Sequence, residues 1–310
     1  MIGLGSIGKR HLGNIRNVLD QRKITYQIDA LRSGYGKKDE ELDQVLYNQY
    51  TSMDEMPSDY DVIFVTNPTS MHYETIQNVV HKTKHMFIEK PVFDTCSHQL
   101  AELGTSQNGI YYVACPLRHK TILQYVAKEI VEKKKIIMAR ILSTSYLPDW
   151  RKGVDYRTVY SAQKKLGGGV TLDLIHEWDY ATDLFGFPET VMQLAGHVSD
   201  LEMDCEDVSL YLAKYPEMIL EMHLDYIGHK TERMLQIFTD RERIDVDLIQ
   251  NSIKVYRNNL LVDTKQFKEE DPYRNEMEYF VDCINGEKRN INSIERAYRT
   301  LQIATKGEKG

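Results

Sequence analysis

Three glycines stand directly before an acid and a histidine in the segment 167–179, GGGVTLDLIHEWD. A helix that begins after the glycines would carry Asp173 and His176 on one face, because they are three residues apart. A histidine titrates near neutral pH and can exchange a proton with a substrate hydroxyl, while a carboxylate can orient the histidine. The residue types equally allow a helix-capping acid beside a buried, hydrogen-bonded histidine. We also expect the glycines to let the backbone pass close to a substrate.

A second group of residues suited to chemistry is the glycine-rich segment GLGSIG at 3–8, which has the GxGxxG spacing. Its glycines allow a tight turn, close approach of a pyrophosphate and close helix–strand packing, and the phosphates then lie at a helix start. Only two residues precede this segment, so either the chain lacks its true start or the first strand is very short. The predicted cofactor contacts here are Gly3, Gly5, Ser6, Ile7 and Gly8.

The identity of the dinucleotide depends on the end of the next predicted strand, 24–33. An NAD site usually has an acid at that end for the ribose hydroxyls. Asp29 lies earlier, within the predicted strand, and the strand-end positions are Arg32 and Ser33. A guanidinium and a hydroxyl suit a 2′-phosphate, so we expect NADP in preference to NAD. The alternative is that Arg32 stacks on the adenine or is solvated.

Strand-like and helix-like segments alternate over the first third of the chain, which predicts a parallel sheet with right-handed crossovers. Ligands bind at the carboxyl edge of such a sheet, so we expect cofactor contacts where the strands end. Those contacts are Thr66, Asn67, Pro68, His72, Glu89 and Lys90. After strand 24–33, the predicted strands are 61–70, 85–91 and 109–117, and the predicted helices are 71–83 and 97–107.

The remainder of the chain predicts a second domain with a large open sheet. Several strand-like segments follow one another without helices between them, which is typical of an antiparallel or mixed sheet. We therefore divide the chain into domains 1–117 and 118–310. The predicted strands are 135–150, 190–200, 208–216, 218–228, 232–240, 243–250 and 252–259, and the predicted helices are 121–134, a helix after the glycines, 276–287 and 293–306.

Composition limits the class of partner. The 310 residues carry a net charge of −7 and a pI near 5.8, which argue against nucleic acid or an anionic membrane as the main partner. The four cysteines lie far apart and have no metal-ligand spacing, so we expect reduced thiols, no metal site and a cytoplasmic location. Nothing in the sequence resembles a signal peptide or a membrane span.

Several of these motifs occur together in one known family. GLGSIG, TNPTSMH at 66–72, EKP at 89–91, the glycine-led segment and EMEYFVDCINGE at 276–287 resemble the Gfo/Idh/MocA oxidoreductases in order and spacing. The resemblance implies an α/β protein with an N-terminal Rossmann dinucleotide-binding domain and an α+β domain whose open, mainly antiparallel sheet forms homodimers or homotetramers. It also implies hydride transfer between a nicotinamide and a hydroxyl-bearing carbon of a sugar or related compound.

The resemblance assigns roles to individual residues. Lys90 matches the active-site lysine of the family, Asp173 and His176 match its acid and histidine, and His72 matches the histidine near the nicotinamide. Many relatives space the acid and the histidine as Asp-x-x-x-His, whereas here two residues separate them. His176 is therefore the preferred general acid or base, and the orientation of Asp173 is in question.

Polar and aromatic residues upstream of the glycines could recognise a substrate. Trp150 and Tyr156 can stack on a sugar, Arg151 and Arg157 can bind a carboxylate or phosphate, and Arg118 opens the second domain. They predict a small-molecule sugar that is acidic or nucleotide-activated. Each could instead be a surface or interface residue. Two other functions remain open: an NAD-dependent glycosidase of the same fold family, and a non-catalytic regulatory protein that senses a dinucleotide or a sugar.

Overall fold

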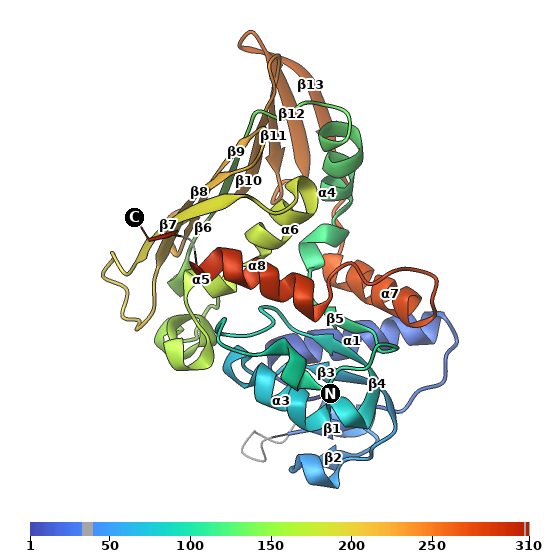
Figure 1. Ribbon diagram of the computed structural model, residues 1–310. Coiled ribbons are helices and arrows are strands. Elements are labelled where there is room, and N and C mark those ends of the chain that lie inside the picture. Colours follow the sequence, from blue (N-terminus) through green and yellow to red (C-terminus); the bar gives the residue numbers. More distant parts are fainter. Residues whose placement is uncertain (33–39, 307, 310) are drawn as a thin grey trace. The chain divides into compact units, whose positions relative to one another are not determined.

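The computed structural model of the chain describes residues 1–32, 40–306 and 308–309 and consists of two compact units (Figure 1). The first unit contains Met1–Pro116 and Pro272–Arg299, and the second contains Leu117–Asp271 and Thr300–Gly310. The predicted domain 118–310 therefore differs from the observed units, because its segment 272–299 packs with the N-terminal part. Predicted site residue Ser33 lies outside the described residues.

The first unit is built on a parallel sheet. Ile2 forms single bridges to Leu31 on one side and to Val65 on the other, and thereby takes the place of a first strand between two groups of strands. The resulting order is β2-β1-Ile2-β3-β4-β5, with all pairs parallel. The strands are β1 (Ala30–Leu31), β2 (Gln49–Tyr50), β3 (Tyr60–Val65), β4 (Thr83–Ile88) and β5 (Tyr111–Val113).

Helices from both ends of the chain complete this unit. The core is aromatic: Phe87 of β4 contacts Phe64 of β3, and both contact Phe280 of a C-terminal helix, with ring centroids 5.2–6.0 Å apart. Phe280, with Met277 and Val281 of the same helix, thus joins a core whose other buried residues lie between Met1 and Cys115. The helices are α1 (Ser6–Gln21), α2 (Glu40–Val45), α3 (His72–Val79) and α7 (Pro272–Ile284), and α8 (Ile294–Lys306) begins in this unit.

The second unit contains a nine-stranded sheet of order β13-β12-β11-β10-β6-β9-β8-β7-β14. Its pairs are antiparallel except β6–β9 and β7–β14, so the predicted large, mainly antiparallel sheet is confirmed. The strands are β6 (Met138–Tyr146), β7 (Thr190–Gly196), β8 (Val208–Lys214), β9 (Ile219–Asp225), β10 (Ile227–Phe238), β11 (Arg243–Asp247), β12 (Ser252–Arg257), β13 (Leu260–Gln266) and β14 (Glu308–Lys309).

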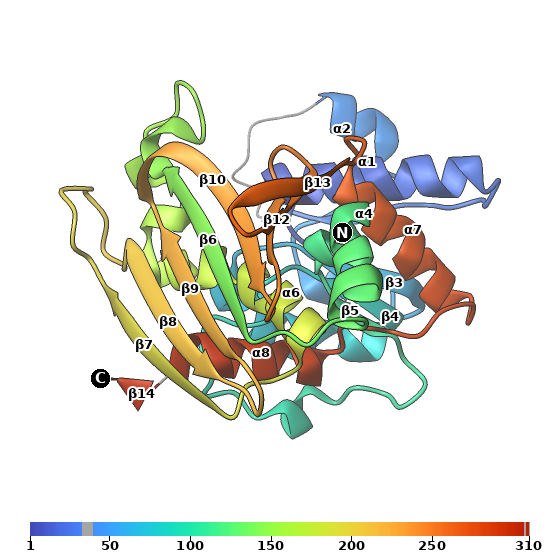
Figure 2. The ribbon, with the colours of Figure 1, turned by 90° about the horizontal axis from the view of Figure 1, so that it is seen from above.

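Helices cover one face of this sheet (Figure 2). Trp178 of α6 packs edge-to-face on Tyr211 of β8, with centroids 5.2 Å apart, and neither side chain is exposed beyond 2%. Along β7–β9 the alternate side chains point away from the helices and are exposed, among them Leu194, Leu212 and Ile219. The helices are α4 (Thr121–Tyr125), which continues as π-helix Val126–Val131, α5 (Val170–Asp173) and α6 (His176–Phe185).

Three sequence predictions of local structure are wrong. In the segment 24–33 only β1 is a strand, because its partner β2 is also two residues long. In 97–107 only Leu100–Leu103 is helical, as a 3₁₀ turn that ends at Gly104 with a φ of 69°. The glycine-led helix is two helices, because Leu174 leaves the helical region at φ −92° and ψ 25°. Strand β13 was not predicted.

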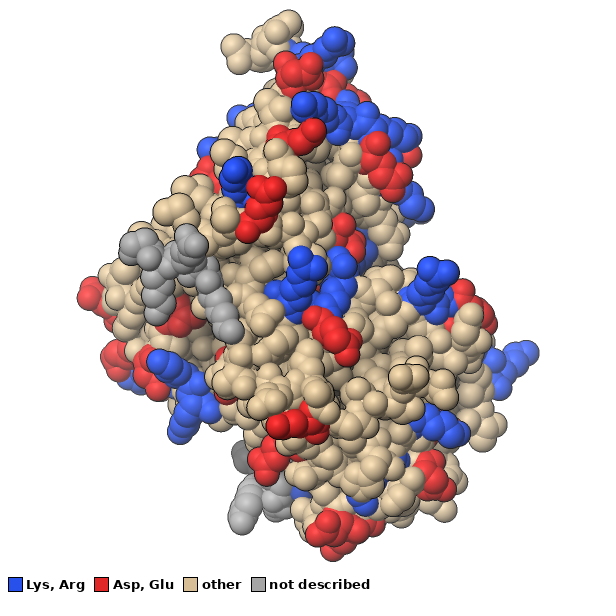
Figure 3. Space-filling view, viewed as in Figure 1, with Lys and Arg blue, Asp and Glu red and all other residues tan. Residues whose placement is uncertain are grey.

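The distribution of surface charge and the apolar character of the helices relate to the expected absence of nucleic-acid and membrane partners. Figure 3 shows acidic and basic side chains mixed over the face in view. Among the described residues, no helix has the length and apolar character needed to cross a membrane.

Candidate active site

The glycine turn in the first unit has space for backbone only. Gly3 has a φ of 86°, and a Cβ there would lie 2.7 Å from the backbone nitrogen of Asn67. A Cβ on Gly8 would lie 2.2 Å from the carbonyl oxygen of Gly3. Gly5, by contrast, is exposed, and nothing lies within 4 Å of a Cβ at that position. Ser6 and Ile7 then begin α1, so exposed backbone amides and a helix N-terminus are available to an anion.

Residues that follow β3 hold this turn in shape. The buried Thr66 hydroxyl donates to the carbonyl oxygens of Ile2 (3.0 Å) and Gly3 (2.5 Å). The Asn67 side chain donates to Thr75 Oγ1 at 2.8 Å, and Pro68 is exposed beside it. For Thr66 the structure shows a hydroxyl engaged with the loop itself, which is a supporting position and not the direct cofactor contact that the sequence predicts.

His72, the first residue of α3, is also enclosed by protein. One ring nitrogen lies 2.9 Å from the Asn67 carbonyl oxygen, and the other lies 3.1 Å and 3.2 Å from those of Pro91 and Val92. Burial lowers the pKa of His72, although these carbonyl groups oppose the shift. His72 therefore joins the loop after β3 to the loop after β4, and its ring nitrogens face backbone oxygens.

The end of β1 has the charge pattern that the sequence predicts. Arg32 directly follows the strand, and its Nη1 donates to Gln49 Oε1 at 2.9 Å. Asp29 precedes the strand, and its carboxylate accepts from the Asn48 backbone (3.0 Å) and the Tyr60 hydroxyl (2.8 Å). The acid near this edge is therefore engaged with the protein, and the side chain at the strand end is a cation.

Lys90 lies just after β4, next to a buried ion pair. The carboxylate of Glu89 accepts from His11 Nε2 of α1 at 2.5 Å and from the Lys90 backbone N–H at 3.0 Å. Burial, the largest effect, favours the neutral acid, but the hydrogen bond and charge of His11 together with the charges of Lys90 and His72 outweigh it, so the pKa of Glu89 lies below its usual value. Both oxygens of Glu89 are thus engaged by protein, which places the predicted cofactor contact in a supporting position behind Lys90.

In the second unit, Asp173 ends α5 and His176 begins α6. Asp173 accepts from the Ser161 hydroxyl at 2.6 Å and from the Tyr226 hydroxyl at 3.1 Å. His176 is buried, with 9% of its surface exposed. The break at Leu174 separates the two residues, so the predicted single helix face does not exist. The described contacts of Asp173 tie α5 to the sheet.

The glycines before α5 approach the protein's own chain. A Cβ on Gly168 would lie 2.3 Å from the carbonyl oxygen of Tyr160. Gly169 has a φ of 111°, and a Cβ there would lie 2.6 Å from the carboxylate of Glu206. That carboxylate accepts from the Thr171 backbone at 3.2 Å. The expectation that the glycines admit a substrate is therefore corrected: they admit backbone and a helix-capping acid.

Arg118 is the clearest departure from the sequence-based prediction of substrate contacts. Its side chain is 1% exposed and forms two parallel hydrogen bonds with Asp179 of α6, at 2.6 Å and 2.8 Å. Its Nη1 also donates to Asp183 at 3.1 Å. A guanidinium neutralised by two carboxylates and closed to solvent is a structural group, so Arg118 is withdrawn as a substrate ligand.

The predicted substrate segment contains one further neutralised arginine. Arg157 is exposed but pairs with Asp155 at 2.8 Å and with Glu202 at 2.9 Å, and these partners raise its pKa. The Tyr156 hydroxyl accepts from the backbone N–H of Glu202 at 2.9 Å. Arg151 is exposed, and together with Trp150 it lines a small hollow. The cations that motivated an acidic substrate therefore have acidic partners or point to solvent.

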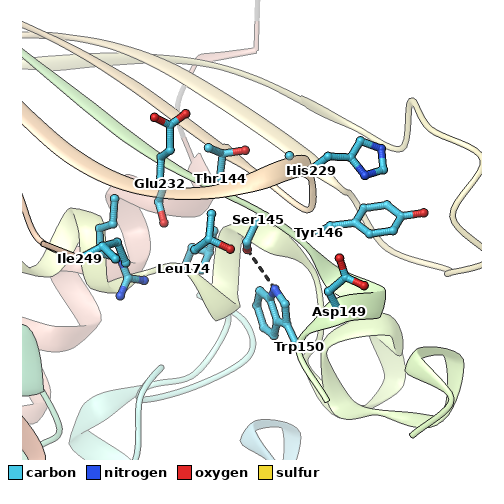
Figure 4. Close-up of a pocket in the computed structure, with 13 residues that line it drawn as sticks. Thr144, Ser145, Tyr146, Asp149, Trp150, Leu174, His229, Glu232 and Ile249 are labelled. Atoms are coloured by element: carbon cyan, nitrogen blue, oxygen red, sulfur yellow. Dashed lines mark hydrogen bonds between the residues drawn. The ribbon is translucent and has the colours of Figure 1, made fainter. Parts of the chain in front are cut away.

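A cavity of ≈ 290 Å³ lies in this unit between the ends of β6 and β10 and the α5–α6 turn (Figure 4). We call it the β6–β10 cavity. Trp150 is the only predicted site residue in its wall among the described residues. The register of β10 shifts between Ile227 and Glu232, and Gly228, His229, Thr231 and Glu232 of this irregular stretch line the cavity. Its walls are Ser143, Thr144, Ser145, Tyr146, Asp149, Trp150, Leu174, Gly228, His229, Thr231, Glu232, Arg233 and Ile249.

The first unit can now be compared with known proteins. Residues 1–114 match the family model described as the oxidoreductase family with an NAD-binding Rossmann fold, GFO_IDH_MocA. Residues 1–114 thus carry the NAD-binding Rossmann fold of the Gfo/Idh/MocA oxidoreductase family. The resemblance noted in the sequence is thereby confirmed. The β6–β10 cavity lies outside the segment matched by the family model.

One curated relative and many solved structures resemble this chain. The uncharacterised oxidoreductase YrbE of Bacillus subtilis (strain 168) is 27% identical over 202 residues, which is 63% of this chain and 56% of that protein. The match thus spans little more than half of the curated relative. UDP-N-acetylglucosamine 3-dehydrogenase GnnA of Acidithiobacillus ferrooxidans has a TM-score of 0.76 at 16% identity, covering 98% of this chain and 94% of that one.

A third similar protein is a levoglucosan dehydrogenase, solved with NADH and levoglucosan. Its TM-score is 0.79 at 15% identity, again covering 98% of this chain and 94% of that chain. At these identities the likeness establishes the two-part fold: an N-terminal Rossmann domain and a C-terminal mixed, mainly antiparallel sheet with helices.

Sequence reasoning missed two groups of residues at these sites. His11 lies eight residues after Gly3 on the buried face of α1, and its place among apolar residues was an available signal. The cavity residues Gly228, His229, Thr231, Glu232 and Arg233 could not be found, because a register shift inside a strand leaves no pattern in the sequence beyond Gly228. A Cβ at Gly228 would lie 1.9 Å from Thr144 Oγ1.

Proposed function

We propose that this protein is an NAD(P)-dependent oxidoreductase that acts on a hydroxyl-bearing carbon of a sugar or sugar derivative. The observation that carries the proposal is the glycine turn before α1, where Cβ atoms on Gly3 and Gly8 would collide with backbone and Gly5 is open. Such a turn fits a pyrophosphate at the start of a 16-residue helix. The bound dinucleotide supplies the hydride donor or acceptor.

The protein's own groups would manage the proton and the charge on oxygen. Lys90 donates a hydrogen bond to the reacting oxygen and stabilises its developing negative charge. His176 takes the hydroxyl proton during oxidation or returns it during reduction. His11 and Glu89 hold the backbone at Lys90, and Asp173 holds the end of α5 through Ser161 and Tyr226. In this proposal only Lys90 and His176 act on the substrate directly.

For the cofactor, we propose NADP in preference to NAD. Arg32 follows β1 at the edge where a ribose would bind, and a guanidinium suits a 2′-phosphate. Asp29 is engaged by Asn48 and Tyr60 and is not available to the ribose hydroxyls.

A sugar-type substrate is supported by two observations. The similar structures include proteins named as dehydrogenases of UDP-N-acetylglucosamine and of levoglucosan. The β6–β10 cavity contains an aromatic side chain together with hydroxyl and carboxylate groups, a combination that binds sugars. We also propose that the open face of β7–β9 joins protomers into a dimer or tetramer, since its leucines are exposed. The four cysteines, none of which forms a disulfide, accord with the cytoplasmic location that is part of the proposal.

The proposed reaction is tested by nicotinamide absorbance with NADH, NADPH and their oxidised forms against neutral sugars, amino sugars, sugar acids and nucleotide sugars. With an accepted substrate, Lys90→Ala should lower kcat at least about a hundredfold, the scale of losing one oxyanion-stabilising donor, while cofactor affinity is retained. The matched control is Lys84→Ala, which removes an exposed lysine of β4 paired with Asp61. Wild-type turnover in Lys90→Ala would refute the role of Lys90, and glycoside hydrolysis without net absorbance change would replace the proposed reaction.

A further inference from the structure

One wall of the β6–β10 cavity is an aromatic ring held in place from two sides. Trp150 donates from Nε1 to Ser145 Oγ at 2.9 Å, the bond drawn in Figure 4. Its ring also packs edge-to-face against Tyr226, with centroids 5.2 Å apart and an interplanar angle of 89°. The indole is nevertheless 39% exposed. A fixed, partly open aromatic ring binds the C–H face of a sugar ring with little loss of side-chain entropy.

Some of the charged side chains in the cavity wall have an oppositely charged partner in the protein, and one does not. Arg233 lies 2.7 Å from the buried carboxylate of Glu177. Complete burial raises the pKa of Glu177, and Arg233 opposes that shift. Glu232 pairs with Lys230 at 2.8 Å. Within the described part of the chain, Asp149 makes no hydrogen bond or ion pair. The wall therefore ends with one carboxylate that has no protein cation beside it.

The wall also contains two further aromatic side chains with polar atoms, His229 and Tyr146. His229 packs against Tyr146 with ring centroids 4.3 Å apart and an interplanar angle of 38°. This pair lies at the same end of the cavity as Asp149 in Figure 4, whereas Leu174 and Ile249 lie at the other end. The Asp149 end thus carries polar and aromatic groups, whereas at the other end Leu174 and Ile249 lie on the same side as the carboxylate-bearing Glu232.

The cavity adjoins the turn that carries the proposed proton-transfer residue. Leu174 belongs to the cavity wall and lies in the break between Asp173 and His176. Tyr226, which supports Trp150, also donates to Asp173 at 3.1 Å. Displacement of the indole would therefore shift Tyr226 and, through its hydrogen bond, Asp173 at the end of α5, directly before the turn.

We propose that the β6–β10 cavity is the subsite for a sugar ring without an acidic substituent, stacked on Trp150 and held through a hydroxyl or amino group by Asp149. This inference rests on the proposed function and narrows its substrate class. An uncompensated carboxylate attracts an ammonium group, accepts hydrogen bonds from hydroxyls and repels a sugar acid. The substrate ring is thus neutral or cationic, contrary to the acidic sugar that the arginines of the sequence indicate.

The test is ligand-observed NMR on the full chain with glucosamine, glucose and glucuronate, which differ in charge. We expect the wild type to bind glucosamine and glucose more tightly than glucuronate. Asp149→Asn should reduce the affinity ratio of glucosamine to glucuronate about tenfold, because the charge is removed at constant shape. Trp150→Ala should weaken all three probes, whereas Trp150→Phe retains an aromatic ring and should retain most of the binding. Asp263→Asn, which changes an exposed carboxylate on β13 outside the cavity, is the matched control.

Three results would overturn the proposal: tightest binding of glucuronate by the wild type, an unchanged affinity ratio in Asp149→Asn, or no probe whose binding depends on Trp150. The proposed reaction and the proposed subsite can be refuted independently of each other. If a nicotinamide-dependent substrate is found and its KM is unchanged in Asp149→Asn and Trp150→Ala, the subsite is wrong and the reaction stands. If the probes bind as expected but no sugar supports turnover, the subsite stands and the reaction is wrong.

Discussion

His11 and Glu89 form a buried hydrogen bond of 2.5 Å between the helix after the glycine turn and the residue before Lys90. Within the described residues, Nδ1 of His11 has no hydrogen-bond partner, so Nε2 is the nitrogen that donates to the Glu89 carboxylate. The other carboxylate oxygen of Glu89 accepts from the Lys90 backbone N–H. One side chain therefore connects the helix that would receive the cofactor phosphates to the main chain at Lys90.

The first prediction treats His11 as a positioning residue for Lys90. His11→Phe keeps an aromatic ring beside Phe87, whose centroid lies 4.8 Å away, but removes the donor to Glu89. We expect kcat to fall about tenfold or more, the scale of a lost charge-assisted hydrogen bond, while cofactor affinity changes less than about threefold. Steady-state kinetics and cofactor titration measure both. His11→Gln restores an N–H donor and should recover part of kcat; equal kcat in all three proteins would contradict the role.

The second prediction concerns acid stability. The folded-state pKa of Glu89 lies below 4.5, so its ionised form contributes stability that is complete above pH 4.5 and is lost as the pH falls through the folded-state value. Glu89→Gln lacks this contribution. Urea unfolding should therefore show a difference in free energy between wild type and variant that is largest near neutral pH and decreases below pH 4.5. Curves that stay parallel over this range would exclude the linkage.

The third prediction separates two glycines of the same chain segment. Gly8→Ala places a methyl group 2.2 Å from the Gly3 carbonyl oxygen, whereas nothing lies within 4 Å of a Cβ at Gly13. We expect Gly8→Ala to weaken dinucleotide binding more than tenfold, because the turn must distort. Gly13→Ala should leave binding unchanged and stabilise α1 by up to about 1 kcal/mol. Cofactor fluorescence and thermal unfolding report these two effects, and equal affinities in both variants would refute the turn as the phosphate site.

The fourth prediction uses the two cofactors as controls for each other. If Arg32 binds a 2′-phosphate, Arg32→Ala should weaken NADPH about tenfold and leave NADH nearly unchanged, because only one of them carries that group. Isothermal titration of both cofactors measures the difference. An equal loss for both would mean that Arg32 stacks on the adenine and would remove the basis for the NADP preference.

The fifth prediction tests the sheet as an interface. Leu194 on β7 is 70% exposed, and Leu260 on β13 is exposed to a similar degree at 66%. Leu194→Asp should lower the mass seen in sedimentation velocity, because a charge within an apolar interface is costly. Leu260→Asp lies at the opposite edge of the sheet and should not. A monomeric wild type, or a mass unaffected by Leu194→Asp, would refute the proposed interface.

The sequence indicated the fold well because the signals involved are local. The glycine spacing, the alternation of strands and helices, and the run of strands after residue 190 each depend on neighbouring residues, and each is present in the structure. Local signals do not predict strand length where the length depends on the partner strand, nor a helix break that no residue type marks. The strand predicted at 24–33 is short because its partner is short, and the break at Leu174 is not marked by glycine or proline.

Site residues were predictable as positions but not as contacts. Lys90 and Arg32 follow their strands as expected from the sequence. Arg118 gave the same signal as a ligand-binding arginine, because sequence alone does not reveal that Asp179 and Asp183 lie against it. Glu89 and Thr66 were placed correctly at the sheet edge, yet their side chains turn to His11 and to the glycine turn.

The position of Phe280 in the core of the first unit has a consequence for synthesis on the ribosome. Phe64 and Phe87 leave the exit tunnel early, but the ring that packs against both is not translated until the second unit is almost complete. At about 5–20 residues per second, that delay is on the order of ten seconds. The nascent nucleotide-binding unit is therefore begun first and finished last, and during that interval its uncovered aromatic surface is a target for chaperones and proteases.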